Sequence, residues 1–227
     1  MDNNSFTTLC RKGYLVLGGL TAIALVGYGL SYVIAMPQVS PGGFVPTTSS
    51  NAGSGLLFGA VQGICILLYA FAFLPVNVMF TIKRHRDNPY ALVFAACLLG
   101  VSLLLELVNN LPLVMARVYP VTLQNIPPDV ALYLRQVETI RYLSYDVTGF
   151  TLAYAAILVY ALVYFQSHRL LAYTSIASII LFVANVPCLW FAPNLAVILM
   201  SISVFAFAPV PILLARMAIE CTPVFLL

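Results

Sequence analysis

The sequence predicts an all-α protein, a bundle of six helices that each cross a membrane, and three observations support this prediction. Of the 227 residues, 62% are hydrophobic and only 7% are charged, the apolar residues form six long runs, and Lys and Arg gather between the runs. A soluble domain carries about 25% charged residues. A chain of this composition could not hide its apolar surface from water, so we expect it to lie in lipid.

Each run is close to the roughly 20 residues that a helix needs to cross a bilayer. We expect the spans at residues 14–36, 55–82, 89–116, 142–165, 170–191 and 195–215. The first run is longer than the core of a cleaved signal peptide, and no clear small-residue cleavage site follows it, so we interpret it as a retained span. Close helix contacts are expected at its small residues, Gly18, Gly19, Gly27 and Gly29.

Prolines are expected to shape two of the spans. Pro75 is expected to break the second span, because proline removes a helix hydrogen bond and its ring clashes with the preceding turn. Pro209 and Pro211 are expected to kink or locally open the sixth span for the same reason.

The connections between the spans differ in length and charge. The first is an uncharged linker rich in Pro, Gly, Ser and Thr, and three others are short turns. The linker is 37–54, and the turns are 83–88, 166–169 and 192–194. The longest connection, 117–141, contains an expected helix that starts near Asp129 and continues into the fourth span.

The distribution of Lys and Arg predicts the orientation of the chain. If the N-terminus is cytoplasmic, seven of these residues lie on the inner side and three on the outer side. Because cytoplasmic loops carry the excess of Lys and Arg, we expect both termini to be cytoplasmic. The chain then divides into a cytoplasmic N-terminus (1–13), a six-span domain (14–216) and a short cytoplasmic tail (217–227).

A polar stripe leads into the fourth span. Along the expected helix, polar residues and one glycine recur at steps of three and four, so that they share one helix face. These residues are Arg135, Glu138, Arg141, Tyr142, Tyr145, Asp146 and Gly149. The stripe is the densest cluster of polar groups in the sequence, and it reaches the mouth of a membrane helix.

A second polar group lies within the third span. Glu106, Asn109 and Asn110 are three and four residues apart and so lie near one face. A charged residue inside a membrane costs at least a few kcal/mol and therefore usually has a function. Gln62 and Asn185 also lie in apolar runs, and in the expected orientation all five residues fall toward the outer side.

Together these residues predict a polar pocket that opens outward. Its expected lining is Glu106, Asn109, Asn110, Arg141, Tyr142, Tyr145 and Asp146. In such a pocket Glu106 could hold a proton and pass it on, Arg141 could bind an anionic head group, and the two tyrosines could orient a polar one. The alternative is structural: Arg135, Glu138 and Arg141 would form ion pairs on a wetted helix, and Glu106 would bond to Asn110.

The sequence leaves three functions open. The first is the binding or transport of a small amphiphilic molecule in the outward pocket. The second is an intramembrane cyclase or isomerase that acts on a lipid or isoprenoid, with Glu106 and Asp146 as catalytic acid and base. The third is a non-catalytic subunit of a membrane complex, in which the stripe between Arg135 and Asp146 contacts a partner subunit.

Membrane lipids are the expected surroundings, and no cofactor, metal or nucleic-acid partner is expected. His85 and His168 are the two histidines and both fall in turns, whereas a membrane haem needs ligands inside the bundle. The five cysteines are scattered, without a CxxC or a His/Cys cluster, which argues against a zinc site. The net charge of +3 is small and no basic patch is interleaved with aromatic residues, so nucleic acid is not indicated.

The layout resembles a family of bacterial six-span membrane proteins of unknown function. The similar features are the extended loop after the first span, the final hairpin of spans, and two sequence stretches. These stretches are LLELVNN in the third span and VTGFTLAYAAILVYALVYFQSHRLL with its tight basic turn. The resemblance implies an integral protein of a bacterial inner membrane, and it implies no activity and no site residue.

Overall fold

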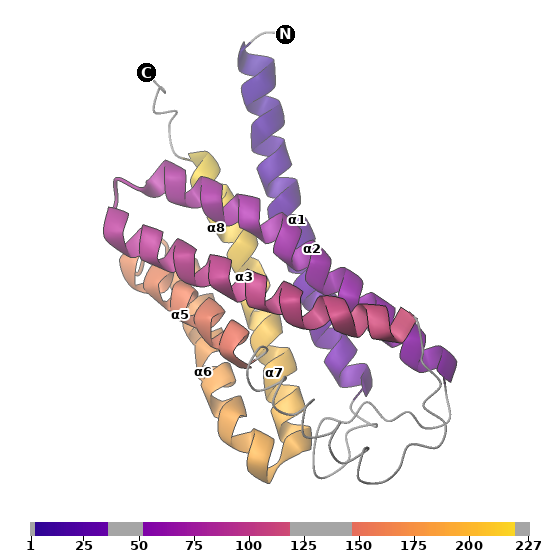
Figure 1. Cartoon of the computed structure of the whole chain (residues 1–227). Coiled ribbons are helices and arrows are strands. Elements are labelled where there is room, and N and C mark those ends of the chain that lie inside the picture. The colour runs from indigo at the N-terminus through magenta and orange to yellow at the C-terminus, as the bar shows by residue number, and fades with distance from the viewer. Residues whose placement is uncertain (1–2, 36–51, 119–146, 221–227) are drawn as a thin grey trace.

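The computed structural model describes residues 3–35, 52–118 and 147–220, and within these ranges the chain forms helices and no strand. The helices are α1 (Asn3–Ala35), α2 (Ala52–Arg84), α3 (Pro89–Val118), α5 (Thr148–Val163), α6 (Arg169–Phe191), α7 (Pro193–Phe207) and α8 (Pro209–Glu220) (Figure 1). The expected all-α fold is confirmed for this part of the chain. The helix expected after Asp129 lies outside the described residues.

Five segments of these helices are long and apolar enough to cross a membrane. They are Arg11–Leu30, Gly63–Arg84, Pro89–Val108, Arg169–Cys188 and Ile198–Glu220. The segments coincide with the first, second, third, fifth and sixth expected spans, as in a multi-pass membrane helix bundle. In the fourth expected span, α5 is apolar and has 16 residues, and residues 142–146 of that span are not described.

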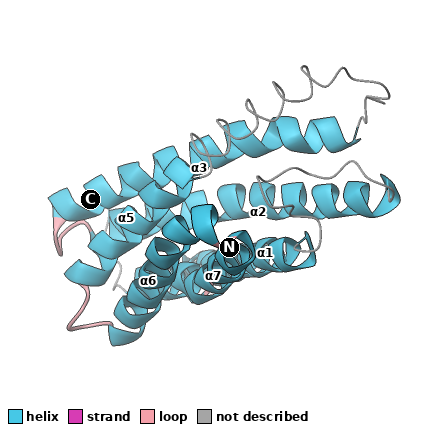
Figure 2. Cartoon of the chain, turned by 90° about the horizontal axis from the view of Figure 1, so that it is seen from below, coloured by secondary structure: helices cyan, strands magenta, loops and turns pink. Residues whose placement is uncertain are grey.

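The helices pack into one bundle in which α5 lies between α3 and α6. α2 packs against both α1 and α3, and the consecutive helices α7 and α8 pack against α1 and α6. α2 and α3 run side by side over most of their length (Figure 2). The start of α1, the end of α8 and the turns after α2 and α5 lie at the same end of the bundle, as antiparallel spans require.

The prediction that Pro75 breaks the second span is wrong. α2 continues through Pro75 from Ala52 to Arg84. The side chains of Phe73 and Val76 on either side of the proline are fully buried. Their packing against other helices keeps the chain helical where a single backbone hydrogen bond is lost.

The sixth expected span consists of two helices, which confirms the predicted local opening at Pro209 and Pro211. α7 ends and α8 begins on either side of Ala208. Pro209 and Pro211 both lack a backbone N–H group, so two hydrogen-bond donors are missing within three consecutive residues. The amide of Ala208 spans the break, lying 3.0 Å from the carbonyl oxygen of Val204 and 3.3 Å from that of Phe205.

Aromatic rings fill the centre of the bundle and join four helices. Tyr154 of α5 stacks on Phe182 of α6 with ring centroids 4.4 Å apart. Phe207 of α7 contacts Tyr154 at 5.8 Å and Phe73 of α2 at 6.0 Å. Such pairs add about 0.5–1.5 kcal/mol each beyond the area that they bury.

α1 packs against its neighbours through glycine. A Cβ atom on Gly18 would lie only 3.0 Å from the Cβ of Ala215 in α8. Added Cβ atoms on Gly27 and Gly29 would lie 2.7 and 2.8 Å from side chains of α2 and α7. A Cβ on Gly19 would have no described atom within 4 Å. The predicted close contacts are therefore confirmed for three of the glycines, and the prediction for Gly19 is wrong.

This difference between adjacent glycines predicts opposite effects of the same substitution. Gly18→Ala should destabilise the bundle by about 1–3 kcal/mol, because the added methyl group overpacks a contact with α8. Gly19→Ala should leave stability unchanged or raise it slightly, because it gains helix propensity and meets no neighbour. The measurement is the midpoint of thermal unfolding of both variants in the same detergent. Equal midpoints would show that α1 does not pack tightly against α8.

Candidate functional site

Glu106 is the buried acidic side chain of the described part of the bundle. It is 2% exposed, whereas the side chains of Asp87 and Glu220 are 39% and 45% exposed. Glu106 lies 17 residues after Pro89, the first residue of α3, which is about 26 Å along the helix. It therefore lies inside the bundle, far from the end that holds the charged turns.

The Glu106 carboxyl group lies where three helices meet. A Cβ atom on Gly149 of α5 would be 2.8 Å from Oε1 of Glu106, so the carboxyl group rests directly on the α5 backbone. Tyr69 of α2 lies close enough for its phenol group to interact electrostatically with the carboxylate. Gly149 therefore leaves room for the carboxyl group in this position, and a Cβ atom there would make it shift.

The structure describes part of the predicted pocket. Asn109 and Asn110 follow Glu106 by one turn in α3, and their side chains are not described. Four residues of the predicted pocket lie outside the described residues, namely Arg141, Tyr142, Tyr145 and Asp146. Asp146 comes three residues before Gly149 in the sequence. The gathering of these groups around Glu106 stays a prediction.

Asn185 is another buried polar residue of the bundle. It lies 16 residues after Arg169, the first residue of α6, or about 24 Å along the helix. Its Nδ2 lies 3.7 Å from Sδ of Met200 in α7, and its Oδ1 has no hydrogen-bond partner among the described residues. Asn185 and Glu106 thus lie at similar distances along their helices, and α5 lies between these helices. Their common position toward the outer side stays a prediction.

The sequence prediction missed Asn77, a buried polar residue whose side chain contacts two other helices. It is 1% exposed on α2. Its Oδ1 accepts a 2.6 Å hydrogen bond from the Tyr160 hydroxyl of α5, and its Nδ2 lies 3.4 Å from the carbonyl oxygen of Ala96 in α3. The signal that could have found it is the one that singled out Asn185, a lone amide side chain in an apolar run.

A second set of hydrogen bonds joins α5, α6 and α7. The hydroxyl groups of Tyr154 and Ser203 form a short hydrogen bond, and Ser203 Oγ lies 2.8 Å from the carbonyl oxygen of Ser178. A carbonyl can only accept, so Ser203 donates its proton to Ser178 and Tyr154 must donate to Ser203. The series of hydrogen bonds ends at a backbone carbonyl, which has no proton to pass on. It therefore holds the helices together and does not form a proton path.

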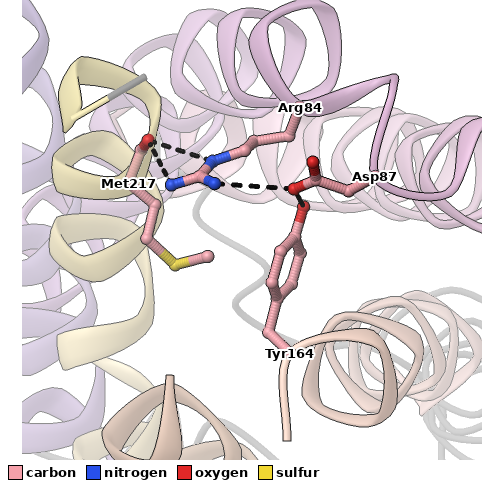
Figure 3. Close-up of polar contacts among 4 residues, drawn as sticks. All are labelled: Arg84, Asp87, Tyr164 and Met217. Carbon is pink, nitrogen blue, oxygen red and sulfur yellow. Dashed lines mark hydrogen bonds and ion pairs between the residues drawn. The ribbon is translucent and has the colours of Figure 1, made fainter. Parts of the chain in front are cut away.

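A third set of polar contacts closes the charged end of the bundle, which Figure 3 shows. Arg84 donates from Nε and Nη2 to the carbonyl oxygen of Met217 in α8, at 3.2 and 3.1 Å. Its Nη1 lies 3.5 Å from Oδ2 of Asp87, which also accepts a 2.8 Å hydrogen bond from Tyr164, the residue that follows α5. Arg84 thereby satisfies a carbonyl in the last turn of α8 that has no partner within the helix.

Within the described ranges, no group of three or more His, Cys, Asp and Glu side chains could hold a metal ion. The fold and the buried carboxyl group define a helical membrane protein in which, among the described residues, one acidic side chain is buried. Comparisons of the chain with protein-family models, with curated proteins and with solved structures find no match.

The contacts of Arg84 predict that it contributes more to stability than Arg216, which also has an acidic partner among the described residues. Arg84→Gln should destabilise the protein by about 1–3 kcal/mol, because the carbonyl of Met217 and the carboxylate of Asp87 lose a charged partner. Arg216→Gln removes an exposed pair with Glu220 and should cause no measurable change. Thermal unfolding in detergent measures both. An equal loss in both variants would contradict the assignment.

Proposed function

We propose that the protein binds or transports a small amphiphilic molecule, whose polar group meets Glu106 inside the membrane. The supporting observation is the 2% exposed Glu106 carboxyl group, held between α2, α3 and α5 and against the backbone of Gly149. A carboxyl group is costly in an apolar interior, and the cost is usually met where the group has a function.

The depth of Glu106 suits an amphiphile that enters from the end opposite the charged turns. At about 26 Å from the start of α3, Glu106 would lie near the far boundary of a hydrocarbon core roughly 30 Å thick. A polar head group could reach the carboxyl group there while the apolar part stays in the bundle or in lipid. The contacts of Arg84, Asp87 and Tyr164 oppose entry from the charged end.

The proposal includes six spans with both termini in the cytoplasm. The 16 residues of α5 extend only about 24 Å, so the sixth crossing needs the residues that precede them, as the expected span 142–165 provides. Seven basic residues, namely Arg11, Lys12, Lys83, Arg84, Arg86, Arg169 and Arg216, lie at the end that holds both turns. An excess of Lys and Arg supports a cytoplasmic location for that end, and the resemblance suggests a bacterial inner membrane.

Glu106→Gln tests the role of the carboxylate, because it keeps the shape of the side chain and removes the charge. We expect the variant to fold and to retain the bound molecule about tenfold or more less well, the loss that follows removal of a charged hydrogen-bond acceptor. Native mass spectrometry of the purified protein measures retention. Glu220→Gln, at the exposed acidic residue of the charged end, is the matched control and should retain the molecule fully.

The outcome separates the proposal from its alternatives. A folded Glu106→Gln protein with unchanged retention would overturn the proposal. A wild-type protein that carries a stoichiometric partner chain and no small molecule would instead favour a subunit of a larger membrane complex.

Gly149→Ala tests the same site from the opposite helix. The added methyl group would meet Oε1 of Glu106 at 2.8 Å, and the flexible carboxyl end can move away, so we expect an intact fold and weaker retention of the molecule. Gly100→Ala in α3 is the control, because a Cβ there meets no described atom within 4 Å. Retention equal in both variants would show that the position of the carboxyl group does not matter for binding.

A further inference from the structure

The charged end of the bundle carries more basic groups than its acidic groups can neutralise. Asp87 and Glu220 are the described acidic residues at this end. Asp87 pairs with Arg84 at 3.5 Å, and Glu220 pairs with Arg216 at 2.7 Å. Both acidic groups are thus already bound to an arginine of the chain.

Five further cations at this end have no acidic partner among the described residues, namely Arg11, Lys12, Lys83, Arg86 and Arg169. Arg86 and Arg169 are exposed, and Lys83 is partly exposed in the last turn of α2. Arg11 and Lys12 belong to α1, whereas Lys83, Arg86 and Arg169 lie at the two turns and form a basic surface that is open to an external anion. We call these last three residues the basic triplet.

The triplet comes from two turns that lie next to each other. Asp87, one residue after Arg86, accepts the hydrogen bond of Tyr164 at the end of α5. The ring of Tyr164 lies 5.8 Å from that of His168, the residue before Arg169. The same contacts that close the end of the bundle therefore hold the turn 83–88 beside the start of α6.

An exposed apolar strip begins directly beside Arg169 and follows α6 into the membrane. Leu170, Tyr173 and Ile180 are exposed by 62%, 58% and 62%, and their spacing of three and seven residues keeps them on one helix face. The ring of Phe165, also exposed, packs edge-on against Tyr173 at 6.3 Å. A row of cations above an apolar strip matches a molecule with an anionic head and long apolar chains.

We propose that this surface binds an anionic phospholipid. Its phosphate lies beside the basic triplet, and its acyl chains lie along the exposed face of α6. Charge complementarity selects the head group, since each Lys or Arg near an anionic membrane surface strengthens binding about fivefold. The apolar strip selects a lipid over a soluble anion, because it adds burial of acyl chains that inorganic phosphate lacks. The site does not depend on the pocket at Glu106.

The experiment compares lipids that differ only in head-group charge. The purified full chain is placed in mixed micelles with phosphatidylglycerol or with phosphatidylcholine of the same acyl chains, and native mass spectrometry measures the bound lipid. We expect about tenfold or greater preference for phosphatidylglycerol, which salt should weaken because ionic screening reduces attraction at exposed charges. Equal binding of the two lipids would overturn the proposal.

Variants locate the site on the surface. Lys83→Gln, Arg86→Gln and Arg169→Gln combined should abolish the preference, and Arg86→Gln or Arg169→Gln alone should each reduce it about fivefold. The matched control combines Arg216→Gln and Glu220→Gln, which keeps the net charge of the same end and should keep the preference. If the triple variant does not fold, the single variants give the same test. A preference that survives in the folded single variants would overturn the assignment.

A competition experiment distinguishes a lipid site from a general anion site. Inorganic phosphate and glycerol phosphate, at the ionic strength of the lipid assay, should leave phosphatidylglycerol bound because they cannot occupy the apolar strip. Displacement of the lipid by either anion at low millimolar concentration would overturn the proposal in favour of a soluble-anion site.

Discussion

The amide side chain of Asn77 is the contact on which the arrangement of α2, α3 and α5 depends. Neither lipid nor an apolar core can satisfy a buried amide, so Asn77 must find its partners on neighbouring helices. It accepts from Tyr160 and lies within hydrogen-bond distance of the Ala96 carbonyl. These contacts agree with the rotation of α3 in which Leu99, Leu103 and Glu106 lie on its buried face. With α3 held in this rotation, the carboxyl group of Glu106 has to point into the bundle.

The two ends of the bundle are built from different chemistry. At the charged end, Arg84, Asp87 and Tyr164 bind one another and the backbone of α8, and the remaining cations face outward. At the other end, Glu106 rests on the bare backbone of Gly149. One end therefore suits contact with anionic head groups at the membrane surface, and the other suits a polar group that enters the interior.

Local rules predicted well wherever one helix decided the outcome. Five of the six expected spans follow from the length of the apolar runs, and the break at Pro209 and Pro211 follows from the loss of two backbone hydrogen-bond donors. The rules failed where packing between helices determined the local structure. At Pro75 a single backbone N–H donor is missing, and the buried neighbours Phe73 and Val76 keep α2 continuous. Gly19 was misjudged for a related reason, since composition shows that a glycine can allow a close contact but not which face meets a neighbour.

The sequence by itself determined that this chain is a helical membrane protein, because apolar residues in runs of about 20 can be satisfied only by helices in lipid. It also singled out Glu106, since a lone acidic group in such a run is visible without a structure. Only the tertiary structure decided that Gly149 makes room for the carboxyl group, that Asn77 joins three helices and that Arg84 caps α8. Those contacts join residues that are distant in sequence, and their geometry depends on how each helix is rotated against its neighbours.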